Sequence, residues 1–341
     1  MKVVVASDKY KGCLTSQEVG RAISAGISDA IADADVTVVG IADGGDGIAT
    51  AIGTTDAVVI ETAQIVGLAI TPEERRNPLV LSTRRVGEAI RGAIESGARR
   101  IIVGLGGSAT CDGGSGLLAA LGARFRDRRG IVFEPCGGAD LERIAEIDIE
   151  DVLRLVAGVE IIGACDVDNP LCGERGAARV FAPQKGADAV AVERIERGMV
   201  GYGALLGTGV AEARGAGAAG GMGAALIAIG GRLCRGIDIV LDEIDFDGMI
   251  AGADLVITGE GHIDGQTVMG KAPWGVILRC ISRGVRVAAF GGQVDDDVDI
   301  HGCELIEVSD RSRPLSEEMR PEVARQRLRA AAAQFIGKGR Y

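Results

Sequence analysis

Short apolar runs alternate with longer amphipathic stretches along this chain. The short runs are rich in Val and Ile and are bounded by Gly or Asp, and the stretches between them carry apolar residues at helical spacing. This alternation is typical of βα units around a largely parallel sheet, so the sequence predicts an α/β fold. The predicted strands cover residues 3–7, 36–41, 58–61, 101–105, 159–165, 254–258, 285–290 and 305–308. The predicted helices cover residues 16–31, 83–96, 113–121, 190–206, 219–233, 273–282 and 321–335.

The length of the chain favours two domains. At 341 residues it is about twice the size of a typical domain of ~150 residues. No low-complexity linker interrupts it, so ordered chain must cross any domain boundary, and an inserted domain is the more natural arrangement. We expect a Rossmann- or flavodoxin-like parallel-sheet domain, formed by residues 1–55 and 250–341, with a second α/β domain, residues 56–249, inserted into it.

Charge and composition argue against several classes of partner. The net charge is −11 and no dense run of Lys or Arg is present, so nucleic acid is not expected. The eight cysteines form no CxxC pair, and we interpret them as reduced thiols. Only five apolar residues precede Asp8, too few for a signal-peptide core, and glycines interrupt the longest uncharged stretch, 215–231. We therefore expect a cytoplasmic protein with no membrane partner.

Polar segments that contain glycine follow several of the predicted strands. In open α/β sheets, ligands bind outside the carboxyl ends of the strands. Each segment alone is weak evidence, because Gly, Asp and Asn also form ordinary surface turns, but five at equivalent places are harder to dismiss. These segments span residues 7–12, 42–47, 104–114, 166–170 and 258–267.

The segment 104–114 has two interpretations. The backbone N–H groups of Gly106, Gly107 and Ser108 are suited to cradle a phosphate group. The same residues also fit the G-x-G-x-x-A pattern of dinucleotide-binding folds, with Asp127 near the position expected for a ribose-binding acid. The glycines at 113, 114 and 116 disfavour the second interpretation, since each glycine inside a helix costs ~1 kcal/mol relative to Ala.

A second near-match covers residues 265–271, which read G-x-x-x-x-G-K. A true P-loop requires Ser or Thr directly after the lysine to hold magnesium, and this chain has Ala272 there. Gly265 also lies well beyond the predicted strand end at Thr258, so we reject a P-loop. Lys271 remains a good phosphate-binding charge just before a helix that starts with proline, with a solvated surface lysine as the equal alternative.

The types of potentially catalytic residue in the chain favour phosphoryl transfer over hydrolysis. The chain has two histidines and no G-x-S-x-G motif, so a Ser-His-Asp mechanism has little to work with. The polar segments supply carboxylates, lysines and glycines instead. Phosphoryl transfer is catalysed mainly by positioning, Mg²⁺ and positive charge, with one carboxylate to accept the hydroxyl proton.

Several longer strings resemble the bacterial glycerate kinase family of the two-domain type. They are SDKYKGCLTSQE, ADGGDG, GLGGSATCDGGSGLLAALGARF, ACDVDNPLCGERGA with FAPQKGA, GAGAAGGMGAAL and GADLVITGEGHIDGQTVMGKAPWGV, in order over nearly the whole chain. The resemblance implies ATP and Mg²⁺ as cofactors and D-glycerate as acceptor. It also implies 2-phosphoglycerate as the usual product and two α/β domains that flank the active-site cleft.

The chain departs from the family pattern at two positions inside these strings. Members usually have Asn where this chain has Cys111, and commonly Arg where it has His262. Loss of a guanidinium at 262 removes a bidentate anion binder. These departures allow a catalytically silent sugar-acid-binding regulator as an alternative to the kinase. A second alternative is a nicotinamide-dependent oxidoreductase, which rests on the G-x-G-x-x-A pattern of residues 104–109. The expected oligomeric state is a monomer or a homodimer.

The residues that match the family's motifs are expected to have the family's functional roles. The catalytic candidates are Asp166, Asp168, Lys9 and Lys11, with Lys9 and Lys11 toward the glycerate carboxylate or the transferred phosphate. The substrate-binding candidates are Asp8, Asp43, Gly44, Gly45, Asp46 and Asn169. Phosphate and nucleotide contacts are expected from Gly106, Gly107, Ser108, Thr110, Glu260, Asp264, Gln266, Thr267 and Lys271. The expected metal ligands are Asp168 and Asp264.

We expect Asp166 to be the general base. Asp166 and Asp168 follow a predicted strand and precede a proline that favours extended backbone. Alternate side chains of an extended segment point the same way, so one carboxylate is expected to take the proton from glycerate while the other binds Mg²⁺. The alternative for these two, and for Glu260 and Asp264, is capping of nearby N–H groups in turns.

Overall fold

The computed structural model describes residues 1–41 and 56–339, and these form two compact units. Unit 1 comprises residues 1–41 and 237–339, and unit 2 comprises residues 56–236. Unit 2 thus interrupts unit 1 in the sequence. Unit 1 begins again at Ile237 rather than at the expected residue 250, because Ile237, Leu241 and Phe246 are buried in its core. Four expected substrate-binding residues, Asp43, Gly44, Gly45 and Asp46, lie outside the described residues.

Unit 1 is built on a five-stranded parallel sheet. Its strands are β1 (Lys2–Ser7), β2 (Asp35–Gly40), β10 (Leu255–Ile263), β11 (Val287–Val294) and β12 (Cys303–Glu307), in the spatial order β12-β11-β10-β1-β2. Val3 of β1 is in register with Leu255 on one side and Val36 on the other. Counted along the chain, this is the 2-1-3-4-5 order of flavodoxin-like folds, whose ligand site lies where β1 adjoins the third strand, here β10.

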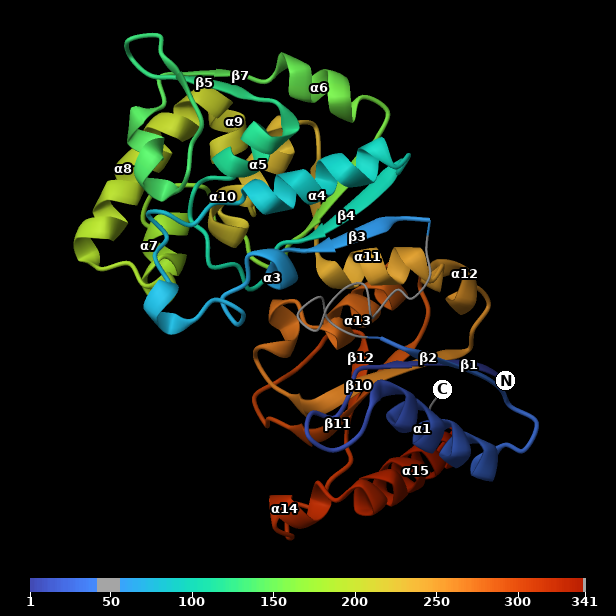
Figure 1. Ribbon diagram of the computed structural model, residues 1–341. Coiled ribbons are helices and arrows are strands. Elements are labelled where there is room, and N and C mark those ends of the chain that lie inside the picture. The colour runs from blue at the N-terminus through green and yellow to red at the C-terminus, as the bar shows by residue number, and fades with distance from the viewer. Residues whose placement is uncertain (42–55, 340–341) are drawn as a thin grey trace. The chain divides into compact units, whose positions relative to one another are not determined.

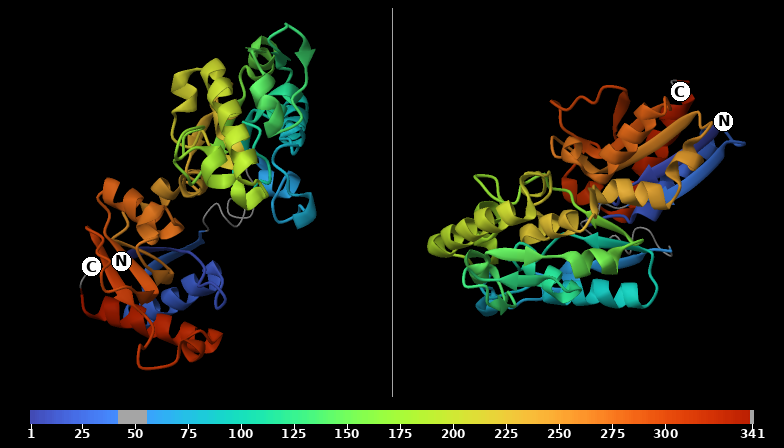
Figure 2. Two further views of the ribbon diagram at one scale, coloured as in Figure 1. Left: turned by 90° about the vertical axis from the view of Figure 1, so that its left-hand side faces the viewer. Right: turned by 90° about the horizontal axis from the view of Figure 1, so that it is seen from above.

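Helices cover both faces of this sheet (Figures 1 and 2). Val3, Val5 and Phe290 pack under α1 (Ser16–Ala30) and α15 (Pro321–Gly337). The alternate residues, Val4 and Ala289 among them, pack under α11 (Gly236–Glu243), α12 (Phe246–Ile250) and α13 (Ala272–Ser282). This division follows from the two-residue period of a strand, which sends successive side chains to opposite faces. A short helix, α14 (Leu315–Glu318), precedes α15.

Unit 2 has a four-stranded parallel sheet and a small antiparallel one. The parallel strands are β3 (Val58–Glu61), β4 (Arg100–Gly104), β8 (Glu160–Ala164) and β9 (Arg232–Cys234), in that order. The antiparallel strands are β5 (Arg124–Arg126), β6 (Val132–Phe133) and β7 (Glu146–Asp148), with β5 in the middle. The helices are α3 (Thr62–Ile65), α4 (Arg84–Glu95), α5 (Ser115–Leu121), α6 (Glu150–Val156), α7 (Ala177–Phe181), α8 (Ala189–Leu206), α9 (Thr208–Ala211) and α10 (Ala218–Ala228). Short 3₁₀ turns cover Glu73–Arg75, Gly138–Arg143, Pro183–Lys185 and, in unit 1, Thr267–Met269.

The predicted α/β class is confirmed, with eight predicted strands present. The helix predicted over 219–233 is wrong over its last third, residues 229–233, because α10 ends at Ala228 and β9 begins at Arg232. Gly220 and Gly221 inside α10 have φ of 73° and 98°, a left-handed kink that the apolar pattern did not indicate. The short strands β5, β6, β7 and β9 were also missed, since runs of two or three residues carry no clear periodicity.

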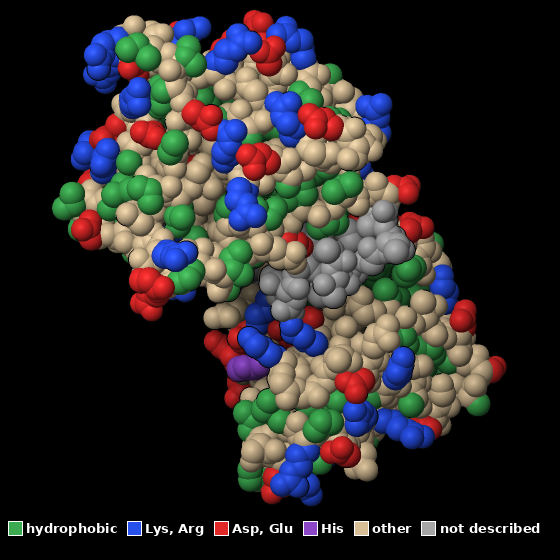
Figure 3. Space-filling view, in the orientation of Figure 1, with side chains coloured by type: hydrophobic (Ala, Val, Ile, Leu, Met, Phe, Trp, Pro, Cys, Tyr) green, Lys and Arg blue, Asp and Glu red, His purple; other side chains and the backbone are tan. Residues whose placement is uncertain are grey.

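The surface has no single-sign character on the face seen in Figure 3, where Lys and Arg side chains are interspersed with Asp and Glu among the described residues. All eight cysteines are free thiols. Within residues 1–41 and 56–339, none of the helices has the length and apolar character needed to cross a membrane.

Candidate functional site

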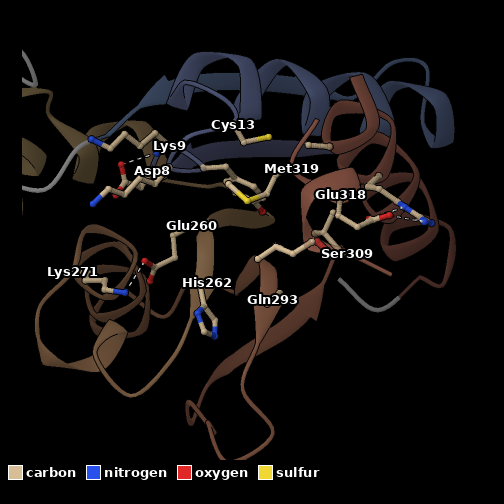
Figure 4. A pocket seen from close by; sticks show the side chains of 18 of the residues that line it. Asp8, Lys9, Cys13, Glu260, His262, Lys271, Gln293, Ser309, Glu318 and Met319 are labelled. Atoms are coloured by element: carbon tan, nitrogen blue, oxygen red, sulfur yellow. Dashed lines mark hydrogen bonds and ion pairs between the residues drawn. The ribbon is translucent and has the colours of Figure 1, made fainter. Parts of the chain in front are cut away.

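A cavity of about 590 Å³ opens at the carboxyl ends of β1, β10 and β11 in unit 1. This is the switch point at which the strand order of the sheet reverses, where flavodoxin-like folds bind their ligands. Figure 4 shows Asp8, Lys9, Glu260 and Lys271 at one end of it and Cys13, Met319 and Glu318 toward the other. Among its lining residues are six predicted from sequence: Asp8, Lys9, Lys11, Glu260, Gln266 and Lys271.

The segment after β1 is fixed to the neighbouring strands. The N–H of Asp8 and the hydroxyl of Ser7 both donate to the carbonyl of Gly259, each over 2.9 Å. Tyr10 is buried and donates its hydroxyl to the carbonyl of Phe290 at 2.9 Å. The carboxylate of Asp8 accepts from the N–H of Lys9 at 2.7 Å. Lys9 and Lys11 therefore extend from a loop that β10 and β11 hold in place.

Lys271 joins two carboxylates at the opposite wall of this cavity. Its Nζ lies 3.1 Å from Oε2 of Glu260 and 3.3 Å from Oδ1 of Asp264. Thr267 donates its hydroxyl to Glu260 at 2.7 Å, and the N–H groups of Gln266 and Thr267 donate to Asp264 at 2.9 and 3.1 Å. Asp264 thus caps a turn, as its alternative interpretation proposed. Lys271, however, is not a solvated surface lysine, because it lines the cavity and its ammonium group pairs with both carboxylates.

Burial and ion pairing shift the pKa values of these three groups. Burial raises the pKa of Glu260, and the hydroxyl of Thr267 and the ammonium of Lys271 oppose that shift. Burial alone would raise the pKa of Asp264, but Lys271 and the two N–H donors lower it. Burial disfavours the charge of Lys271, yet its contacts with Glu260 and Asp264 raise its pKa overall. The lysine therefore stays charged at neutral pH.

Glu260 and His262 lie on a strand, which corrects the prediction of a loop over 258–267. The strand β10 continues to Ile263 because its last residues pair with β11, with His262 in register with Gln293. The distance of Gly265 from the strand end was therefore a wrong reason to reject a P-loop. The other reason stands, since Ala272 follows Lys271. His262 is 48% exposed, lines the cavity and contacts Asp295 through Nε2 at 2.7 Å.

In unit 2, the loop after β4 has two exposed glycines, and a buried lysine from a distant segment of the chain donates hydrogen bonds to it. Gly106 and Gly107 are exposed, whereas Ser108 and Thr110 are buried. Lys185 is only 3% exposed and donates to the hydroxyl of Ser108 at 3.0 Å and to the carbonyl of Thr110 at 2.7 Å. Sequence reasoning assigned Lys185 no role. The available signal was its place in FAPQKGA, a string quoted only for the resemblance.

The segment that follows this loop is part of the core. Asp112 is fully buried and accepts four hydrogen bonds, from the N–H and hydroxyl of Thr83 and the N–H groups of Gly114 and Gly116. Cys111 is also fully buried, and burial raises the pKa of its thiol to about 11. The family departure at 111 therefore changes a core side chain, whereas the departure at 262 changes the wall of a cavity.

Asp166, Asp168 and Asn169 follow β8, but their side chains have different partners. Oδ1 of Asp166 accepts from the N–H of Gly236 at 3.0 Å. Oδ1 of Asp168 contacts Arg175 at 2.6 Å and its other oxygen lies 3.8 Å from Arg214. Asn169 donates to the carbonyl of Arg175 at 2.7 Å. The structure thus gives the two aspartates separate surroundings rather than the shared orientation that their spacing suggested.

The pattern for a dinucleotide site lacks its structural context. The helix that follows the glycines, α5, begins only at Ser115, and Asp127 follows a strand of the small antiparallel sheet. Oδ1 of Asp127 accepts from the N–H groups of Arg129 and Ile131 in a turn.

The expected metal ligands Asp168 and Asp264 belong to different units. Within residues 1–41 and 56–339, no three His, Cys, Asp or Glu side chains are grouped to hold a metal ion.

Comparison with known proteins gives one consistent result. The model of the glycerate kinase family matches residues 3–57 and 50–338. A glycerate kinase from Bacillus cereus is 43% identical over 327 residues, 86% of this chain and 86% of that protein. Glycerate 2-kinase from Escherichia coli K12 is 38% identical over 344 residues, 90% of each chain. A glycerate kinase 2 crystal structure from Salmonella typhimurium LT2 has a TM-score of 0.81 and 36% identity, and the match covers 99% of this chain and 98% of that one.

Proposed function

Because the chain belongs to the glycerate kinase family, we propose that it is an enzyme that transfers the γ-phosphoryl group of ATP to a hydroxyl of D-glycerate. The observation that carries this proposal is the match to named glycerate kinases over 86–90% of the chain, which includes residues of both units. The Escherichia coli relative is named glycerate 2-kinase, and we propose 2-phosphoglycerate as the product here as well. The enzyme's eight free thiols and its use of ATP suit the cytoplasm.

The cavity of unit 1 is suited to the nucleotide. Its volume of about 590 Å³ falls within the ~300–1,000 Å³ of small-molecule sites. We assign Gln266, Thr267 and Lys271 to its nucleotide side, together with Glu260 and Asp264. Lys9 and Lys11 would bind the transferred phosphate or the carboxylate of glycerate, with Asp8 beside them. Point charges from lysine are well suited to phosphate oxygens.

The carboxylates beside Lys271 fit a magnesium ion better than Asp168 does. Mg²⁺ in kinases binds one or two carboxylates together with substrate phosphates. Asp264 and Glu260 lie within 3.3 Å of the same ammonium group, so both face one point of the cavity wall. These two carboxylates share one ammonium group and keep a net negative charge, whereas Asp168 alone faces two guanidinium groups, those of Arg175 and Arg214. When bound, Mg²⁺ neutralises phosphate charge, and Asp264 with Glu260 would hold it.

Unit 2 would contribute the phosphate loop and the base. Gly106, Gly107, Ser108 and Thr110 remain our candidates for phosphate contact. Asp166 remains our candidate for the base that takes the proton from the glycerate hydroxyl, with Asp168 and Asn169 beside it. Proton acceptance by a positioned carboxylate and positioning of the phosphates are the two contributions that phosphoryl transfer requires from the protein.

The test is a coupled assay of ADP release with folded protein, ATP, Mg²⁺ and D-glycerate. We expect turnover that depends on glycerate, and phosphorus NMR of the product to show the 2-phosphate. A thermal-shift panel separates the alternatives, since a ligand that binds only the folded state raises its stability. Stabilisation by NAD(P) would favour the oxidoreductase, and stabilisation by glycerate without any by nucleotide would favour the silent regulator.

Replacing Lys271 with Ala should weaken the use of ATP. A hydrogen bond to a charged group contributes ~1.5–3 kcal/mol, so kcat/KM for ATP should fall by about 10- to 100-fold. The melting temperature should also fall, because Glu260 is buried and loses its cation. Lys338→Ala, at an exposed lysine, is the matched control. Unchanged kcat and KM for ATP in Lys271→Ala would limit this lysine to a structural role.

A further inference from the structure

Lys185 is a buried cation without a carboxylate partner. It ends the 3₁₀ turn Pro183–Lys185 and is 3% exposed. Its Nζ donates to two neutral oxygens, Oγ of Ser108 and the carbonyl of Thr110, and no carboxylate of a described residue lies within ion-pair distance. Burial disfavours its charge and lowers its pKa, while the fields of Cys111 and Asp112 oppose that shift. A buried charge is costly unless it is paired, so its retention here needs an explanation.

The loop that Lys185 holds presents N–H groups and hides carbonyl groups. The carbonyl of Gly106 accepts from the hydroxyl of Thr62 at 3.0 Å, and that of Gly107 accepts from the N–H of Leu68 at 2.7 Å. The carbonyl of Thr110 accepts from Lys185. The N–H groups of Gly106, Gly107 and Ser108 donate to no residue that the structure describes. Successive free N–H groups form an anion-binding concavity.

Two further features of the loop are consistent with a ligand. Gly107 has a φ of +63°, the left-handed conformation that turns successive N–H groups toward one point. Thr110 is 1% exposed, and its Oγ1 has no hydrogen-bond partner among the described residues. A buried hydroxyl without a partner is unusual in a folded protein. The loop thus has unused N–H donors at two exposed glycines and at Ser108, and an unused buried hydroxyl at Thr110.

We propose that the N–H groups of Gly106, Gly107 and Ser108 form an oxyanion site in unit 2, and that Lys185 is its positioning residue. Lys185 holds the loop through its hydrogen bonds to Ser108 and Thr110, in the conformation that leaves the three N–H groups free. The positive charge of Lys185 would also attract the bound anion. This proposal rests on the proposed function and deepens it. The oxyanion is either a phosphate of the nucleotide or the carboxylate of glycerate, and both are substrates of the same reaction.

The first test replaces Lys185 with Met, which keeps the length of the side chain and removes its charge. We expect KM to rise at least tenfold for one substrate and less than twofold for the other. A rise for ATP assigns the site to phosphate, and a rise for D-glycerate assigns it to the carboxylate. A folded variant whose KM values for ATP and for D-glycerate both equal those of the wild type would contradict the proposal. A purely structural lysine would alter only the melting temperature.

The second test remains informative if Lys185→Met does not fold. In Gly106→Ala, the added Cβ meets no atom within 4 Å and φ at 106 is not positive, so the fold should tolerate it. A methyl group on the exposed face of the loop should obstruct an anion and raise the same KM at an unchanged melting temperature. Gly92→Ala, an exposed glycine of α4 with no atom near its added Cβ, is the matched control. A normal KM for both substrates in Gly106→Ala would overturn the proposal.

Direct binding separates this proposal from the proposed function. Inorganic phosphate, ATP with Mg²⁺ and D-glycerate are added separately to the wild type and to Gly106→Ala, and the melting temperature is measured. We expect at least one of these anions to stabilise the wild type and to lose that effect in the variant. If the wild type shows no glycerate-dependent turnover but this difference persists, the site stands and the proposed function fails. Identical shifts in both proteins would reject the site.

Discussion

Asp166→Asn is expected to lower kcat by about 10²–10⁴-fold, the loss typical of removing a general base. The reason is that Asn keeps the oxygen that accepts from the N–H of Gly236, at 3.0 Å from Asp166 in the wild type, but cannot take a proton. KM for ATP and the melting temperature should therefore stay close to their wild-type values. Steady-state kinetics and thermal unfolding of the same preparation measure both quantities.

Two further variants make this prediction specific. Asp166→Ala removes the proton acceptor together with the bond to Gly236, so it should lose both activity and stability. Asp33→Asn, at an exposed aspartate to which no role is assigned, is the matched control and should keep the wild-type kcat. If Asp166→Asn melts several degrees lower with nearly normal kcat, Asp166 caps the start of α11 and is not the base. A loss of apparent Mg²⁺ affinity would instead assign Asp166 to the metal and make Asp168 the next candidate for the base.

Six of the residues singled out in the sequence line the cavity of unit 1, because their positions follow from local signals. Val/Ile runs end at Ser7 and Thr258, and polar residues with glycine come next. The carboxyl ends of parallel strands meet at one edge, so Lys9 and Glu260 had to be neighbours once the strands were adjacent. What the local pattern did not predict was the extension of β10 to Ile263, which depends on pairing with β11.

Two contacts that the sequence did not predict join residues far apart in the chain. Lys185 is 77 residues away from Ser108 in the chain, and Asp166 is 70 residues away from Gly236. Neither pairing has a local signature.

Tertiary packing also explains part of the high glycine content, which the sequence alone did not explain. A Cβ at Gly220 would lie 2.1 Å from the carbonyl oxygen of Thr110. At least this glycine of GAGAAGGMGAAL therefore allows α10 to pack against the segment around Thr110.

Asp112→Ala should be the most destabilising of the substitutions considered. The side chain is fully buried, and its oxygens accept hydrogen bonds from Thr83, Gly114 and Gly116. These bonds connect the segment between β4 and α5 to the start of α4. Its removal leaves several buried donors without acceptors, at ~1–3 kcal/mol for each group that stays unpaired. We expect a loss of about 3–4 kcal/mol in the free energy of unfolding of unit 2, allowing for partial relaxation. Urea denaturation measures this loss.

A control variant and a double-mutant cycle test whether the lost hydrogen bonds cause the loss of stability in Asp112→Ala. Asp33→Ala removes an exposed carboxylate and should change stability by less than about 0.5 kcal/mol. Thr83→Ala removes the hydroxyl that donates to Asp112 and accepts from the N–H of Leu117 at 2.9 Å, so its effect should not add to that of Asp112→Ala. A double variant that loses the full sum of the two single effects would show that Thr83 and Asp112 act independently. A loss below 1 kcal/mol in Asp112→Ala would mean that water or a shifted backbone replaces the carboxylate, and that the segment is not held by this side chain.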